Sequence, residues 1–180
     1  MLAIRQRMEE PGGTGLNPAY TFGTFVIGLG NRFAHAAAVA VAEAPGKAYN
    51  PLFIYGRSGL GQRHLLHAIG HYARALYPHL KVRCASSEAF TVHFIDAATD
   101  GKLDRFRRRY LDPDILLLDG IQSLGNEEAT QEEFFRTFST MCNTGRQIVI
   151  TSDRVPRRLV SLEGRLRAQL ERGLLVEVQP

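Results

Sequence analysis

Residues 51–63 decide the fold, and they read Pro51-Leu52-Phe53-Ile54-Tyr55-Gly56-Arg57-Ser58-Gly59-Leu60-Gly61-Gln62-Arg63. The first five form a short apolar run that stops at a glycine, which is typical of a strand buried on both faces of a sheet. The glycines that follow match the frame G-x-x-x-x-G-K-[ST], except that Gln62 replaces the lysine and Arg63 replaces the hydroxyl residue. Such glycines let backbone N–H groups turn toward phosphate, and the helix that begins here directs its positive end to the same place.

The rest of the chain alternates predicted helices with predicted strands. Apolar periodicity predicts helices over 31–44, 62–76, 88–98, 102–110 and 130–142, with Asn31 as a possible N-cap of the first. Short apolar runs predict further strands over 82–85, 114–119, 147–151 and 174–178. Phe134, Phe135, Phe138 and Met141 share one helix face and are expected in the core. The alternation predicts a three-layer α/β fold with a mostly parallel sheet.

Composition limits the class of protein. The chain has 180 residues, of which 44% are hydrophobic and 22% charged, which is typical of one soluble domain. No apolar run reaches the roughly 18 residues that a membrane span needs. Residues 1–15 are Gly-rich and polar without a secretory apolar region, so we expect a disordered leader and a cytoplasmic protein. Cys84 and Cys142 lack metal-site spacing and are expected to be small buried hydrophobes.

Two polar patterns remain open at this point. His64, His67 and His71 line one side of the predicted helix 62–76, but no fourth zinc ligand lies nearby in the sequence, so a metal site is the less favoured interpretation. The chain carries a net charge of +4, and residues 102–111 hold five basic residues against one acid, Asp104. This basic helix is either a solvated face or a surface for nucleic-acid phosphates.

Longer stretches of the chain resemble a known family. From Leu16 to Pro180 the sequence is similar to the AAA+ ATPase core of the bacterial chromosomal replication initiator, the DnaA family. The matching phrases run colinearly: Asn17-Pro18, Tyr20-Thr21-Phe22, Phe25-Val26-Ile27-Gly28, Asn31-Arg32-Phe33-Ala34, Asn50 to Gly56, His64 to Gly70, Gln131 to Phe135, and Thr151-Ser152-Asp153-Arg154. The resemblance implies a P-loop AAA+ core over residues 16–180, and the family's helical lid and helix-turn-helix domain are expected to be absent.

The resemblance also implies a site for ATP or ADP with Mg²⁺. The phosphate-binding positions would be Gly56, Ser58, Gly59, Leu60, Gly61, Gln62, Arg63 and His64. Val26, Ile27 and Asn31 would lie at the adenine end. Asp119 would match the Walker B carboxylate that holds Mg²⁺, and Asp153 would lie in the sensor strand facing the γ-phosphate.

The same resemblance suggests macromolecular partners. Helices 88–98 and 102–110 resemble the initiator-specific helices that line a channel for single-stranded DNA in the family. The candidate contacts with backbone phosphates are Ile95, Lys102, Arg105, Arg107, Arg108 and Arg109. Other initiator subunits, either copies of this chain or a full-length paralogue, are the expected protein partners.

Four positions depart from the family pattern. Gln62 and Arg63 replace the Walker A lysine and threonine, Gly120 stands where a second Walker B acid activates water, and Gln169 stands where an arginine finger reaches the neighbouring subunit. Together they predict weak, nearly Mg²⁺-independent ATP binding and lost hydrolysis. The alternatives are an ATPase in which Arg63 compensates, a nucleotide-independent module that docks on a full-length initiator, and an unselected gene remnant.

Overall fold

A five-stranded sheet forms the middle layer of the computed structural model, which describes residues 13–180. The strand order is β2-β3-β4-β1-β5. The strands span Leu52–Tyr55 (β1), Val82–Ser86 (β2), Ile115–Asp119 (β3), Gln147–Ser152 (β4) and Leu174–Glu177 (β5). All neighbouring pairs are parallel, which confirms the predicted three-layer α/β class.

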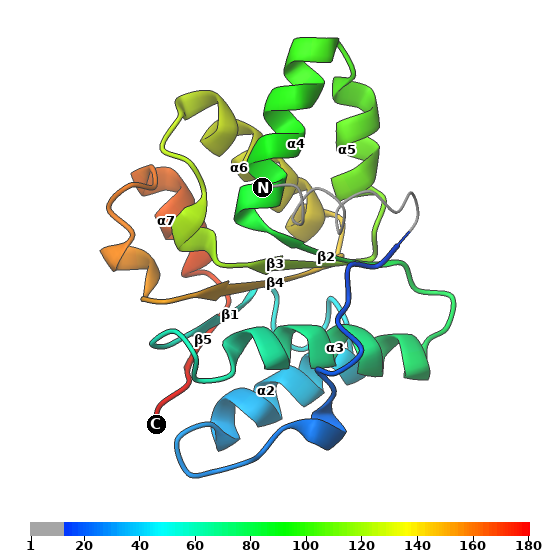
Figure 1. Ribbon diagram of the computed structural model, residues 1–180, viewed down its shortest axis with the longest axis vertical. Coiled ribbons are helices and arrows are strands. Elements are labelled where there is room, and N and C mark those ends of the chain that lie inside the picture. The colour runs from blue at the N-terminus through cyan, green and yellow to red at the C-terminus, as the bar shows by residue number, and fades with distance from the viewer. Residues whose placement is uncertain (1–12) are drawn as a thin grey trace.

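Helices cover both faces of this sheet (Figure 1). On one face lie α2 (Arg32–Glu43) and α3 (Gln62–Leu76). On the other lie α4 (Ser87–Asp100), α5 (Leu103–Leu111), α6 (Glu128–Asn143) and α7 (Gly164–Leu170). Single 3₁₀ turns, η1 (Phe22–Thr24), η2 (Ile121–Ser123) and η3 (Pro156–Arg158), connect these elements.

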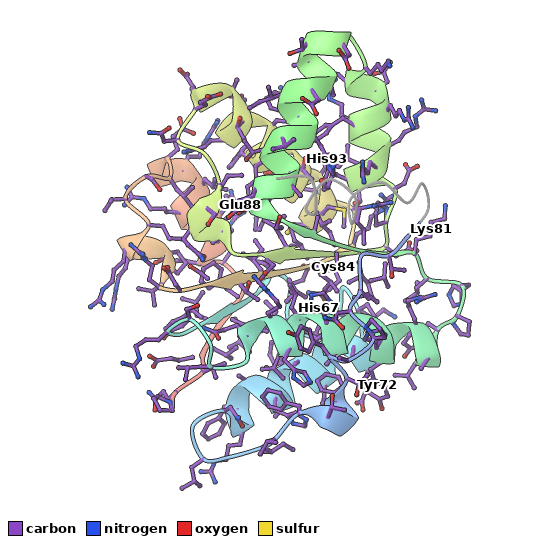
Figure 2. All side chains as sticks on the ribbon, in the orientation of Figure 1. His67, Tyr72, Lys81, Cys84, Glu88 and His93 are labelled. Atoms are coloured by element: carbon purple, nitrogen blue, oxygen red, sulfur yellow. The ribbon has the colours of Figure 1, made fainter. Side chains whose placement is uncertain are left out.

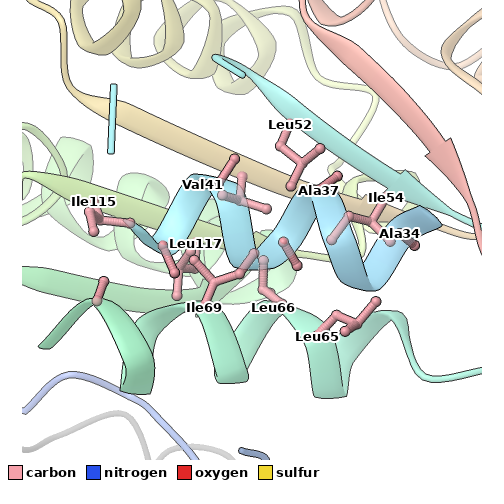
Figure 3. Packing of buried hydrophobic residues seen from close by; sticks show 14 of the residues in the cluster. Ala34, Ala37, Val41, Leu52, Ile54, Leu65, Leu66, Ile69, Ile115 and Leu117 are labelled. Carbon is pink, nitrogen blue, oxygen red and sulfur yellow. The ribbon is translucent and has the colours of Figure 1, made fainter. Parts of the chain in front are cut away.

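The central strand β1 shows why the apolar run is continuous. Leu52 and Ile54 are buried against α2 and α3, whereas Phe53 is buried against the helices of the opposite face. Figure 3 shows the first of these clusters, in which small α2 residues such as Ala34 and Ala37 let the helix approach the sheet and α3 closely. A strand covered on both faces needs apolar residues at every position.

The structure corrects two details of the sequence interpretation. Asn31 precedes α2 but makes no side-chain capping bond to it. Residues 1–12 of the expected leader lie outside the described residues, and the described chain is already attached to the sheet before residue 16, because the Cys84 N–H donates to the Thr14 carbonyl at 2.7 Å. Within residues 13–180 no helix is long and apolar enough to cross a membrane.

Candidate nucleotide site

The glycine loop joins the carboxyl end of β1 to the first turn of α3. Gly59 and Gly61 have φ angles of +88° and +108°, which L side chains rarely adopt, so glycine is required at both. Gly61 also lies against the Phe25 ring, which a Cβ there would meet at 3.0 Å. The loop therefore has left-handed turns next to a helix N-terminus, which is the kind of backbone that binds phosphate through its N–H groups.

Gln62 turns back into this loop. Its side chain is 7% exposed, and its amide nitrogen donates to the Gly56 carbonyl and, at 3.0 Å, to the Arg57 carbonyl. Because both hydrogen bonds end on loop carbonyls, Gln62 cross-links the loop without adding a positive charge. The residue at the lysine position thus stabilises the loop shape and supplies no cation for phosphate.

Arg63 pairs with Asp119 across the same crevice. The Arg63 Nε donates to Asp119 Oδ2 at 2.6 Å, and the aspartate side chain is only 15% exposed. The charge of Asp119, together with this hydrogen bond, raises the pKa of Arg63 above its ordinary value. The other carboxylate oxygen, Oδ1, accepts from the Thr151 hydroxyl at 2.7 Å, and Thr151 Oγ1 accepts from the Gly120 N–H at 2.9 Å. Sequence reasoning missed Thr151, although its position at the end of the strand next to β3 was a usable signal.

These residues do not fit a magnesium ion. Mg²⁺ requires several oxygen ligands in near-octahedral geometry. Asp119 uses both oxygens within the protein, and Arg63 offers a cation where a hydroxyl ligand would be needed. No group of three or more His, Cys, Asp or Glu side chains within residues 13–180 could hold a metal ion.

The backbone at Gly120 is left-handed, with φ +71° and ψ 57°. It sits between Asp119 and η2, and its carbonyl accepts from the Ser87 hydroxyl while its N–H donates to Thr151. Glycine adopts this conformation freely, whereas another L residue is strained there. Position 120, where the family pattern has an acid, therefore has no side chain, and its backbone conformation would strain an acidic residue.

The segment 25–31 lies beside the glycine loop, where the adenine end was predicted. Asn31 closes this segment on itself, since its Oδ1 accepts from the Gly28 N–H at 2.9 Å and its Nδ2 donates to the Val26 carbonyl at 3.0 Å. This is what the Asn31 side chain does in place of capping α2. Val26 and Ile27 are 84% and 56% exposed, so they present apolar surface to solvent.

Asp153 and Gln169 lie at opposite ends of the strands, Asp153 at the carboxyl ends and Gln169 near the amino ends. Asp153 follows β4 at the carboxyl edge, and its carboxylate is paired with the adjacent Arg154 at 2.7 Å. Gln169, on α7, accepts from Arg172 at 3.2 Å and lines a small cavity with Asn50, which lies at the amino end of β1. Gln169 therefore lies at the end of the sheet opposite to the glycine loop.

Comparisons with known proteins decide the family. The model of the bacterial DnaA ATPase domain matches residues 16–177. The chain belongs to the DnaA ATPase domain family. It is 46% identical to domain III of the Thermotoga maritima replication initiation protein DnaA, with a TM-score of 0.89 over 92% of this chain and 69% of that one.

Two further structures extend this similarity. AMPPCP-bound DnaA from Aquifex aeolicus is 39% identical, with a TM-score of 0.87 over 91% of this chain and 51% of that chain. The replication initiator DnaA bound to AMPPCP and single-stranded DNA is 39% identical, with a TM-score of 0.88 over 92% of this chain and 51% of that one. The present chain therefore spans about half the length of these two DnaA proteins.

The three histidines of α3 attach the preceding segment of this DnaA-family domain to the helix. His67 Nδ1 accepts from the Asn17 N–H at 2.9 Å, His71 Nε2 bonds the Asn17 carbonyl at 2.8 Å, and His64 Nε2 bonds the Thr21 carbonyl at 2.7 Å. Figure 2 shows His67 between α3 and Cys84, whose thiol lies 3.8 Å from its other ring nitrogen. The histidine stripe is thus a set of hydrogen-bonding groups for the backbone. Cys84 is buried and Cys142 partly buried, and both are free thiols.

Acid is expected to destabilise the domain through His67. Burial lowers the pKa of His67 to about 4, below its ordinary 6.5. Between these two pH values the unfolded chain therefore binds a proton at this histidine and the folded chain does not. This contribution to the free energy of unfolding is complete above pH 6.5 and is lost as the pH falls toward 4. With allowance for solvent screening, the loss is on the order of 1–2 kcal/mol.

Urea unfolding at several pH values measures this effect. His67→Asn retains a hydrogen-bond acceptor but cannot titrate, so its stability should fall less between pH 6.5 and 4.5 than that of the unchanged chain. His79 is exposed, so His79→Asn serves as the matched control for replacing a histidine without removing a buried ring. Equal profiles for His67→Asn and the unchanged chain would contradict the assignment.

The predicted DNA-contacting residues separate into two groups. Lys102, Arg105, Arg108 and Arg109 line a groove of about 990 Å³ between α4, α5 and the edge of the sheet at β2, together with Lys81 and Arg83. Arg107 instead pairs with the buried Glu133 of α6 at 3.0 Å, which raises the pKa of Arg107. Ile95 is 41% exposed on α4 and is not among the residues that line the groove.

Proposed function

We propose that this DnaA-type domain takes part in replication initiation or its regulation as a weak nucleotide binder that no longer hydrolyses ATP. The observation that carries the proposal is the pair of substitutions in the glycine loop, where Gln62 bonds loop carbonyls and Arg63 neutralises Asp119. The loop and the adenine-side segment are retained, which supports binding of ATP or ADP. Gln62, Gly120 and Gln169 replace the lysine, the second acid and the arginine finger that ATP hydrolysis needs in the family.

Restoring the loop residues is expected to tighten ATP binding. A charge-assisted hydrogen bond contributes about 1.5–3 kcal/mol, so Gln62→Lys with Arg63→Thr should improve affinity by roughly tenfold or more. The unchanged chain should bind ATP poorly, with an affinity nearly independent of Mg²⁺. Calorimetric titration with ATP, with and without Mg²⁺, measures both.

The single variants separate the contributions of the two positions to ATP affinity and to its dependence on Mg²⁺. Gln62→Lys alone should add affinity without dependence on Mg²⁺, whereas the double variant should gain both. Tight, Mg²⁺-dependent binding by the unchanged chain would instead support the alternative in which Arg63 compensates and the domain is an active ATPase.

Single-stranded DNA is the proposed nucleic-acid partner, and other initiator subunits are the proposed protein partners. The proposal is supported by the DNA-bound relative and by the basic groove on α5. Contacts with phosphate alone give binding that is weak, indifferent to sequence and steeply reduced by salt. A cytoplasmic location is part of the same proposal.

The basic helix offers a sharp test of DNA binding. Lys102, Arg105 and Arg108 are exposed, whereas Arg107 is held by Glu133. Replacing the three exposed residues by alanine should reduce the salt slope of single-strand binding by about 2, at roughly 0.7 for each lost phosphate contact. Arg107→Ala removes the same charge type from the same helix and should change the slope less.

Fluorescence anisotropy of labelled single strands over a range of salt concentrations measures these slopes. A slope unchanged by the triple substitution would assign the basic helix to solvation alone. Preference for duplex carrying an origin sequence would also contradict the proposal, because such recognition needs an element that reads base edges in a groove.

The second candidate is a nucleotide-independent module that docks on a full-length initiator. It is favoured by the exposed apolar side chains of Val26, Leu29 and Phe33, which are 84%, 84% and 72% exposed. Co-purification with a full-length initiator, equal in the presence and absence of ATP and lost in Leu29→Ser, would favour this candidate. An unselected remnant would show neither this association nor nucleotide binding.

A further inference from the structure

The Arg63–Asp119 ion pair brings a positive charge to the place where the family resemblance implies a metal ion. Arg63 lies in the first turn of α3 and Asp119 at the end of β3, so the pair bridges the glycine loop and the carboxyl edge of the sheet. Asp119 is held on its other side by Thr151. The guanidinium is therefore held beside the loop by a carboxylate that Thr151 positions.

The guanidinium retains donors for a ligand. Arginine has five N–H groups, and within residues 13–180 the bond to Asp119 is the one that Arg63 makes, through Nε. The Arg63 side chain is 66% exposed, so its terminal nitrogens face solvent beside the loop. Guanidinium nitrogens match the geometry of phosphate oxygens.

We propose that Arg63 acts as a tethered cation in place of Mg²⁺, so that the domain binds its nucleotide without a requirement for the metal. The inference rests on the nucleotide binding proposed above and specifies its independence of Mg²⁺. Mg²⁺ bound to the phosphates of ATP would gain no ligand from Asp119 Oδ2, because Arg63 already bonds that oxygen. Asp119 then holds the Arg63 guanidinium and partly neutralises its charge. A metal ligand, in contrast, would strengthen nucleotide binding by retaining the metal.

This role reverses the effect of removing the carboxylate. In a metal-dependent site, loss of the aspartate charge weakens nucleotide binding because the metal loses a ligand. Here Asp119→Asn removes a negative charge from the phosphate site and releases the guanidinium toward the nucleotide. The variant should bind ATP about tenfold more tightly than the unchanged chain, the effect of one charge-assisted bond. The amide is isosteric and still bonds Thr151, which preserves the fold.

Calorimetric titration with ATP, in chelator and in excess Mg²⁺, tests the proposal on three variants. Asp119→Asn should tighten binding in chelator. Arg63→Thr should release Asp119 and make binding tighter in Mg²⁺ than in chelator. Glu177→Gln is the matched control, because it removes one exposed negative charge from the same edge of the sheet and should alter affinity less than twofold.

The outcomes separate this inference from the proposed function. Weaker binding by Asp119→Asn, or tightening of the unchanged chain by Mg²⁺, would overturn the tethered cation while leaving nucleotide binding intact. Equal tightening by Glu177→Gln would also overturn it, because the effect would then be general electrostatics. Absence of ATP binding by every variant in both conditions would overturn the proposed function itself and the inference with it.

Discussion

No phosphate release above a protein-free blank is expected from Gln62→Lys with Arg63→Thr, even though this variant should bind ATP better. Loss of a general base costs about 10²–10⁴ in rate, and loss of an arginine finger about 10³–10⁵. At the positions that the family resemblance implies for the water-activating acid and the arginine finger, Gly120 has no side chain and Gln169 has no charge. The two losses are on different elements, β3–η2 and α7, and neither is repaired in the glycine loop.

A coupled-enzyme phosphate assay at saturating ATP measures this. A variant that adds Gln169→Arg, tested at a concentration where subunits associate, separates the finger from the missing base. Steady-state release by the double variant would show that another group activates water. The hydroxyl of Thr151 and the side chain of Gln122 would then be the first to examine, because they bond Asp119 and the Asp153 N–H.

A stability loss of about 3–5 kcal/mol is expected for Phe90→Ala, the cost of removing a fully buried aromatic ring. Phe90 lies on the inner face of α4, and its ring centroid is 5.2 Å from Phe106, 4.8 Å from Tyr110 and 5.4 Å from Phe134. One ring thus joins α4 to both α5 and α6. Its removal should loosen the basic helix from the sheet.

Chemical denaturation measures the loss, and Val92→Ala on the same helix is the matched control because Val92 is 42% exposed. The control should change the free energy of unfolding by about 0.5 kcal/mol or less, as surface substitutions do. A similar loss in both variants would mean that α4 packs less tightly than its aromatic contacts indicate.

The sequence predicted the elements well where apolar periodicity was long. α3 begins and ends at the predicted Gln62 and Leu76, and β1 was found because every inward position is apolar. The ends of the other predicted helices differ by one or two residues; α4, for example, continues to Asp100 through polar residues that carry no periodic signal. The helix α7 was not predicted. The alternation of predicted helices and strands was sufficient to predict the three-layer α/β fold.

The site was predicted in its backbone and less completely in its side chains. The glycine frame located the loop, but nothing in the spacing showed that Gln62 would bond loop carbonyls or that Arg63 would reach a carboxylate 56 positions away. The i, i+3, i+7 spacing places three histidine rings on one face and left a metal site as the less favoured interpretation, without indicating what the rings do instead. The backbone partners at Asn17 and Thr21 that explain it lie more than 40 positions earlier in the sequence.

The left-handed backbone at Gly120 has an evolutionary consequence. A single codon change could return an acidic residue to this position, but that residue would meet a backbone conformation that costs a non-glycine residue about 1–2 kcal/mol. The strain would be removed only if η2 and the Ser87 and Thr151 bonds to this peptide rearranged as well. Each intermediate in such a series would be less stable than the present chain. An acidic side chain at position 120 is therefore expected to carry a stability cost in the present backbone, whatever its effect on catalysis.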